Sequence, residues 1–407
     1  MRLLSEKLIY TAGRVISLTV RPLSLFIANN WFLPEAAQGL AIAFLICTLV
    51  MAAIAADPHR RYYAAIFSAE KSNNSLSFYL YVTSILMLMI VGSLITLVVA
   101  GNFTGSIIFA ALVMVYFISE KLADEVLRLR LFERDLRGWG CASALRGLMQ
   151  MGGLAGLFFL FGKNSLGIAI ILIFALSNFA VFIPQLPKYF FHSLIQLQSK
   201  TFYWLIPRAI RLLISNRMLW FIALMGSSVG YLDRIASLVL DKSILPIFAL
   251  VVMCFSIVQM AVDFYYISPR RRDFLEHRIL LTSAMKSRQF VLTIVCGLMG
   301  ALVATACMLY FSTNGHSFPL VYVGAIAVLQ SSLAIGLLPT QILYWRLSFG
   351  KIFHIELIFW IFLGLTLIIG HYLGLMLAGY LTLLSLVIIM RLLALMYCAT
   401  QVDLLSK

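Results

Sequence analysis

The sequence has 407 residues, of which 62% are hydrophobic and only 12% are charged, and its formal net charge is +15. This composition leaves too little polar surface for a water-soluble globular protein and predicts an all-α protein that crosses a membrane many times. The excess of basic residues does not indicate nucleic acid as a partner, because these residues fall in the segments between apolar runs.

Apolar runs of about 20 residues, the length needed to cross roughly 30 Å of hydrocarbon, predict twelve transmembrane helices. The first is expected to stay in the protein, because no compact apolar core with a small-residue cleavage site follows the N-terminus. The twelve are expected near residues 10–32, 36–56, 76–100, 103–119, 139–161, 166–186, 218–240, 246–268, 289–311, 319–343, 352–370 and 374–398.

The distribution of basic residues predicts the orientation of these helices. With a cytoplasmic N-terminus, 24 of the 31 Lys and Arg residues fall on inner segments, and only Lys163 and Lys242 fall on outer loops. This asymmetry follows the positive-inside rule and places both termini in the cytoplasm. The same inner charge predicts attraction to anionic membrane lipids.

The chain divides into an N-lobe at 1–186, an amphipathic cytoplasmic connector at 187–217 and a C-lobe at 218–407. The lobes share landmarks in the same order, which indicates a duplication. Two lobes of six helices each would share one orientation and be related by a pseudo-two-fold axis along the membrane normal. Arg21, Leu33-Pro34, Pro58 and Arg60-Arg61 recur 211 to 213 residues later as Arg234, Leu245-Pro246, Pro269 and Arg271-Arg272.

A polar, cationic stripe is expected once in each lobe. An arginine in the middle of a transmembrane helix costs about 2.5–3.5 kcal/mol on insertion scales, so it usually faces a cavity or a partner. We therefore expect Arg21 and Arg234 to line a cavity between the lobes. The alternative is that each arginine pairs with a carboxylate and locks helices together, or snorkels to the interface. Helical spacing places on one face Arg14, Ser17, Arg21 and Ser24 of the first helix, and Ser227, Gly230, Arg234 and Ser237 of the seventh.

Other charged residues inside predicted helices have two interpretations each. Arg146 and Arg391 either extend the cationic lining or snorkel. Asp233, Asp263 and Glu356 are candidates for coupling to a proton or sodium gradient. The alternative for Asp263 and Glu356 is that they lie at the membrane interface. Asp233 is not a simple partner for Arg234, because adjacent helical residues point in different directions.

The sequence gives no indication of an enzyme, a cofactor or a metal site. It has no HExxH, GxSxG or P-loop motif. Its six cysteines lie within or at the ends of apolar runs, without CxxC spacing, and are interpreted as small core residues.

Three segments resemble polysaccharide flippases of the multidrug/oligosaccharidyl-lipid/polysaccharide exporter superfamily. FLPEAAQGLAIAFLICTLV (32–50) and YLDRIASLVLDKSILPIFALVVMCFSI (231–257) resemble the starts of the two halves, and EKLADEVLRLRLFERDLRGW (120–139) resembles the basic connector after the fourth helix. The second half departs from the pattern, since it lacks the Glu-Gly expected after its outer loop.

The resemblance implies a two-lobed bundle that opens alternately to either side of a bacterial inner membrane. It implies as substrate an undecaprenyl-diphosphate-linked oligosaccharide, such as an O-antigen or exopolysaccharide repeat unit, and other polysaccharide assembly proteins as candidate partners. The arginines agree with this substrate, because guanidinium groups offer paired donors to phosphate oxygens. Two alternatives stay open: a cation-coupled exporter of small organic solutes, and a membrane enzyme or scaffold.

Overall fold

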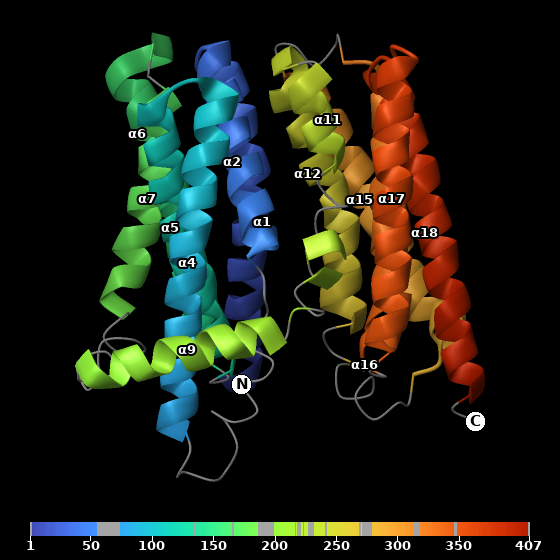
Figure 1. Cartoon of the computed structure of the whole chain (residues 1–407). Coiled ribbons are helices and arrows are strands. Elements are labelled where there is room, and N and C mark those ends of the chain that lie inside the picture. Colours follow the sequence, from blue (N-terminus) through green and yellow to red (C-terminus); the bar gives the residue numbers. More distant parts are fainter. Residues whose placement is uncertain are drawn as a thin grey trace. The chain divides into compact units, whose positions relative to one another are not determined.

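The computed structural model describes residues 2–54, 74–132, 135–164, 167–185, 199–215, 217, 221–222, 224–226, 232–240, 242–267, 270, 279–312, 318–345 and 348–405. The chain forms two compact units, Met1–Leu224 and Met225–Lys407. In Figure 1 the long helices within each unit run side by side. Each unit is described by itself below.

In the described part of the first unit, six long helices form a bundle and a seventh helix, α9, lies across one end (Figure 1). Within the bundle α1 packs along α6, α4 packs along α5, and α7 contacts α2, α5 and α6. The helices are α1 (Arg2–Trp31), α2 (Pro34–Ala53), α4 (Asn74–Thr104), α5 (Ile107–Phe132), α6 (Leu136–Phe161), α7 (Gly167–Phe182) and α9 (Ser199–Ser215).

The second unit is also helical. Its α16 packs along α18 and contacts α12, which in turn packs along α15. The helix α12 continues into a π-helical segment at Val262–Ile267 that includes Asp263. The helices are α11 (Leu232–Leu240), α12 (Leu245–Ala261), α14 (Leu281–Lys286), α15 (Arg288–Phe311), α16 (Leu320–Trp345), α17 (Phe349–Tyr372) and α18 (Leu377–Leu405).

Within the described ranges, nine segments are long and apolar enough to cross a membrane. They correspond to α2, α4, α6, α7, α12, α15, α16, α17 and α18. Both α1 and α5 are long enough as well, but polar and charged residues lower their hydropathy. The seventh expected span, 218–240, lies partly outside the described residues, so the count of twelve helices stays a prediction.

The expected end of the fourth span, at 119, is wrong. The helix α5 continues to Phe132, so the charged run that starts at Glu120 is helical and not a loop. These charges are tolerated because they are paired: Lys121 Nζ lies 2.6 Å from Glu125 Oε1, and the two side chains are 4% and 1% exposed. The Tyr81 hydroxyl of α4 also donates to Glu125. A hydropathy scale does not identify this part of the helix, because it counts Lys121 and Glu125 as two polar residues although their charges neutralise each other.

The starts of the helices repeat along the chain with nearly constant spacing. From α2 to α12, α4 to α15, α5 to α16, α6 to α17 and α7 to α18, the starting residue moves by 211, 214, 213, 213 and 210 positions. The sequence landmarks Leu33-Pro34 and Leu245-Pro246 coincide with the starts of α2 and α12. A proline suits the first helical turn, where its missing N–H is not needed. The order of helices thus repeats at the spacing of the sequence landmarks.

Candidate functional site

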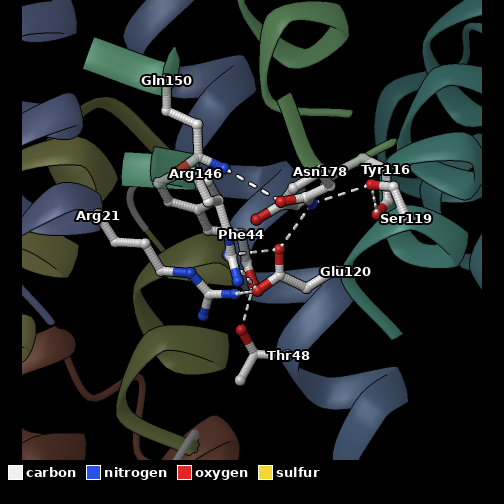
Figure 2. A network of polar contacts seen from close by, with 9 residues as sticks. All are labelled: Arg21, Phe44, Thr48, Tyr116, Ser119, Glu120, Arg146, Gln150 and Asn178. Carbon is white, nitrogen blue, oxygen red and sulfur yellow. Dashed lines mark hydrogen bonds and ion pairs between the residues drawn. The ribbon is translucent and has the colours of Figure 1, made fainter. Parts of the chain in front are cut away.

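The polar centre of the first unit is the Glu120 carboxylate, which lies within α5 and contacts two arginines. Arg21 Nη2 of α1 is 2.5 Å from Glu120 Oε1. Arg146 Nη2 of α6 is 2.8 Å from both carboxylate oxygens. Figure 2 shows both guanidinium groups directed at this carboxylate. Three helices are therefore joined by two cations and one anion.

A buried amide completes the surroundings of Glu120. Asn178 Nδ2 of α7 donates to Glu120 Oε2 at 3.0 Å and to Ser119 Oγ at 3.0 Å (Figure 2). The oxygen of Asn178 accepts a hydrogen bond of 3.3 Å from Gln150 Nε2 of α6. Together with the arginines, Asn178 gives Glu120 four donor contacts, which matches the acceptor capacity of a carboxylate.

Helical spacing places these side chains together. Tyr116, Ser119 and Glu120 lie three and four residues apart on one face of α5, and Arg146 and Gln150 lie four apart on α6. Sequence reasoning singled out Arg21 and Arg146 but missed Glu120, Asn178 and Gln150. These three residues could have been identified as candidates because each is a polar residue within an apolar or helix-periodic run.

Aromatic residues form the apolar side of the same site. The Arg21 guanidinium carbon lies 5.6 Å from the centre of the Phe44 ring. Phe44 in turn packs with Tyr116 and Phe174, with ring centres 6.0 and 5.3 Å away. All three aromatic side chains are buried. These rings exclude water from one side of the ion cluster, which strengthens its electrostatic interactions.

Charge and exposure define what this site can bind. Two guanidinium groups and one carboxylate leave an excess of one positive charge. The Arg21 side chain is 30% exposed, whereas Glu120 is 8% exposed and Arg146 is 12% exposed. An anion that reaches Arg21 would meet a positive site whose donors are already held in place.

The second unit contains a different ion pair, between Arg391 of α18 and Glu356 of α17. Arg391 Nε lies 3.2 and 3.0 Å from the two Glu356 oxygens, and Nη2 also contacts Oε1. The two side chains are 8% and 1% exposed. Gly226 lies close to the pair, since a Cβ there would be 3.7 Å from Glu356 Oε1. This buried fork geometry is typical of a structural pair.

Asp233 belongs to a chain of polar contacts within the second unit. Its Oδ1 accepts from the Arg234 backbone amide at 2.7 Å. Its Oδ2 lies 3.5 Å from Gln330 Nε2 of α16, and Gln330 Oε1 accepts from Gln259 Nε2 of α12 at 2.8 Å. Asp233, Arg234 and Gln330 are all buried. The Asp233 carboxylate thus links α11 to α16, and Gln330 extends the chain of contacts to α12.

Of the remaining stripe residues that the structure describes, Arg14 and Ser24 contact different neighbours. The Arg14 guanidinium carbon lies 5.4 Å from the centre of the Trp139 ring. Ser24 is buried and donates to the Val20 carbonyl of its own helix. Ser17 and Asp263 are half-buried. Ser227 and the side chain of Ser237 lie outside what the structure describes.

The predicted cavity between Arg21 and Arg234 stays a prediction. The two residues belong to different units, and each unit is placed only by itself. The roles expected for the other site residues are likewise untested.

The fold is similar to that of two solved membrane transporters. One is described as the inward-facing conformation of a multidrug resistance MATE family transporter of the MOP superfamily; it is 12% identical, with a TM-score of 0.61, over 95% of this chain and 94% of that one. The other is a MOP superfamily transporter from Pyrococcus furiosus, described as having a binding pocket of reverse polarity that suggests a different function. It is 12% identical, with a TM-score of 0.51, over 99% of this chain and 94% of that one.

No protein-family model and no curated protein matches the sequence. At 12% identity, the structural similarity shows the fold alone: a helical, multi-pass membrane fold of the MOP transporter type. A helical, multi-pass fold of this kind is what the sequence resemblance implies, whereas membership of the superfamily is a finer statement. The polysaccharide-flippase assignment within that superfamily is a finer statement than this similarity carries.

Proposed function

We propose that the protein is a transporter that moves a polyprenyl-diphosphate-linked oligosaccharide from the cytoplasmic to the outer leaflet of a bacterial inner membrane. It does so by alternating access, with both termini in the cytoplasm. The observation that carries this proposal is the cluster of Arg21, Arg146 and Glu120, which has two cations for one anion. A cluster with this charge favours an anionic headgroup.

A diphosphate requires compensation for its charge while it crosses the bilayer. Guanidinium groups supply paired donors to phosphate oxygens and stay charged inside the membrane. Arg21 is the more exposed of the two arginines and is the first contact that we assign to the headgroup. Arg234 of the second unit is a further candidate contact.

Glu120 has a defined role in this proposal. In the absence of substrate it occupies the donors of both arginines, so that neither charge is left uncompensated. A diphosphate that binds Arg21 competes with this carboxylate, while Arg146 keeps Glu120 in place through both of its oxygens. The site therefore exchanges one anion for another without exposing a lone buried charge.

The alternative is a cation-coupled exporter of small organic solutes. A multidrug transporter is among the proteins of similar fold, and Glu120 offers an acidic group that a cation would require. The sign of the charge argues against it, because Glu120 is already outnumbered by arginines. Transport of organic cations by the purified protein in vesicles, with no response to a polyprenyl diphosphate, would favour this alternative.

The proposal is tested by oligosaccharide export in cells that depend on this protein. Arg21→Gln should abolish export while the protein stays in the membrane fraction, because Arg146 still holds Glu120. Arg21→Lys should retain part of the activity, since the charge remains but the fork geometry is lost. Arg128→Gln is the matched control, because Arg128 is also an arginine paired with a carboxylate but is 37% exposed. Normal export by Arg21→Gln would overturn the proposal.

A further inference from the structure

The helix α9 lies across one end of the first unit and packs against α4 (Figure 1). Leu205 and Ala209, four residues apart, are both fully buried at 0% exposure. One face of α9 is therefore fixed to the bundle. Pro207 does not end the helix, which runs from Ser199 to Ser215.

The rest of the α9 surface has two edges of different chemistry. Ile206, Ile210 and Ile214 follow each other at intervals of four residues and form an apolar edge, of which Ile210 is 39% and Ile214 59% exposed. On the opposite edge lie Trp204, Arg208 and Arg211, all of them exposed. Residues at these intervals share a face of a helix.

The basic edge is organised around an aromatic ring. The Arg208 guanidinium carbon lies 3.4 Å from the centre of the Trp204 ring. This cation–π contact holds the charge close to a side chain that prefers the membrane interface. Arg211 follows Arg208 by three residues and therefore adds a second charge to the same edge.

The end of the bundle where α9 lies is basic in other places too. It is the end at which α4 begins, α5 ends and α6 begins (Figure 1). Arg128 and Arg130 lie near the end of α5, and Arg137 lies in the first turn of α6. Arg128 and Arg130 are each paired with a carboxylate, that of Asp124 and that of Asp135.

We propose that α9 is a binding surface for anionic phospholipids. The isoleucine edge enters the acyl-chain boundary, and Arg208 and Arg211 contact the phosphates of the headgroups. An apolar edge beside a basic edge is the arrangement of helices that lie in the plane of a charged membrane surface. Because the basic edge complements a negative charge, α9 prefers an anionic lipid surface over a neutral lipid surface. This inference does not depend on the identity of the transported substrate.

The test uses the full chain with its cysteines replaced and a spin label at position 214, in nanodiscs of phosphatidylcholine with or without phosphatidylglycerol. We expect phosphatidylglycerol to protect the label from a water-soluble relaxation agent and to increase its contact with oxygen. The Arg208→Gln/Arg211→Gln variant should weaken this response to phosphatidylglycerol on the order of tenfold. The Arg208→Lys/Arg211→Lys variant should restore most of it.

The control removes a basic residue at the other end of α6, as Lys163→Gln, and should respond like the unmodified protein. Every variant is first checked for monodispersity by size exclusion. The same label environment in both lipids, or an unchanged response in the Arg208→Gln/Arg211→Gln variant, would overturn the proposal. Protection that depends on protein concentration and not on lipid would also overturn it, since a second copy of the chain would then cover the helix.

Discussion

Gly13 of α1 and Gly140 of α6 bring the backbones of their helices into direct contact. A Cβ at Gly13 would lie 2.3 Å from the Gly140 carbonyl oxygen, and a Cβ at Gly140 would lie 2.4 Å from the Ile9 carbonyl oxygen. Small residues allow this approach between membrane helices. The same two helices carry Arg21 and Arg146, so the glycine contact sets the position of the two arginines relative to each other.

The glycine contact predicts that the effect of a Gly→Ala substitution on stability depends strongly on its position in α6. Gly140→Ala should lower the melting temperature of the purified protein, because the added methyl group meets backbone atoms and overpacking costs about 1–3 kcal/mol. Gly152→Ala, on the same helix, is the control, since nothing lies within 4 Å of its added Cβ. Equal melting temperatures for the two variants would contradict the close approach of α1 and α6.

A second prediction concerns Glu120 as the shared partner of two arginines. Glu120→Gln removes the negative charge that Arg21 and Arg146 share, and these side chains are 30% and 12% exposed. Breaking a fully buried pair costs about 3–5 kcal/mol, which is the upper bound for this partly buried cluster. We expect a lower melting temperature and less protein in the membrane. The double variant Glu120→Gln/Arg146→Gln should recover part of both losses. A double variant as unstable as Glu120→Gln would show that the ion pair is not the cause.

The pair of Arg391 and Glu356 should behave differently from Arg21. Both side chains are at most 8% exposed, and the carboxylate accepts from two nitrogens of the same arginine. Arg391→Gln should therefore reduce the amount of protein in the membrane, and Glu356→Gln/Arg391→Gln should restore it. The measurement is an immunoblot of the membrane fraction beside an export assay. Normal abundance with lost export would instead give Arg391 a role in substrate binding, one of the two interpretations that the sequence left open.

Asp233 allows stability and ion coupling to be separated. Asp233→Asn keeps the oxygen that accepts from the Arg234 amide but removes the ionisable group. The amount of this variant protein in the membrane should therefore be normal. Asp233→Leu removes both polar contacts and should lower stability, because buried donors are left unsatisfied. Transport by the Asn variant in vesicles, with and without a proton or sodium gradient, measures coupling. An unchanged dependence on the gradient would remove Asp233 from the coupling site.

Much of the fold could be predicted from apolar runs and prolines. The apolar runs predicted spans at 36–56 and 246–268, within two residues of the starts of α2 at Pro34 and α12 at Leu245. A proline is favourable in the first turn of a helix, which explains why both helices start at a Leu-Pro pair. The end of α5 could not be found in this way. Charged residues within a bundle are stabilised by partners on other turns or helices, and a hydropathy value for each residue alone does not take such partners into account. Lys121 and Glu125 are an example, since each neutralises the charge of the other.

The candidate site was predicted in part for a similar reason. Arg21 and Arg146 stood out because an arginine inside an apolar helix is costly and requires an explanation. Glu120 did not stand out, since it begins a run of charges that resembled a loop. Asn178 is a single neutral residue in an apolar run, and only the packing of α7 against α5 shows that it reaches Glu120. Such convergence of three or four helices is a property of tertiary packing.

The most direct test of the proposed function is the binding of a polyprenyl diphosphate to the purified full-length protein, compared with the neutral polyprenol of the same length. We predict that the diphosphate binds at least about tenfold more tightly. This preference should disappear in the Arg21→Gln/Glu120→Gln/Arg146→Gln variant, which removes all three charges together and so leaves no unpaired charge in the site. It should persist in Arg128→Gln. Equal affinity for the two lipids, or a preference that survives in the triple variant, would contradict a diphosphate site at Arg21 and Arg146.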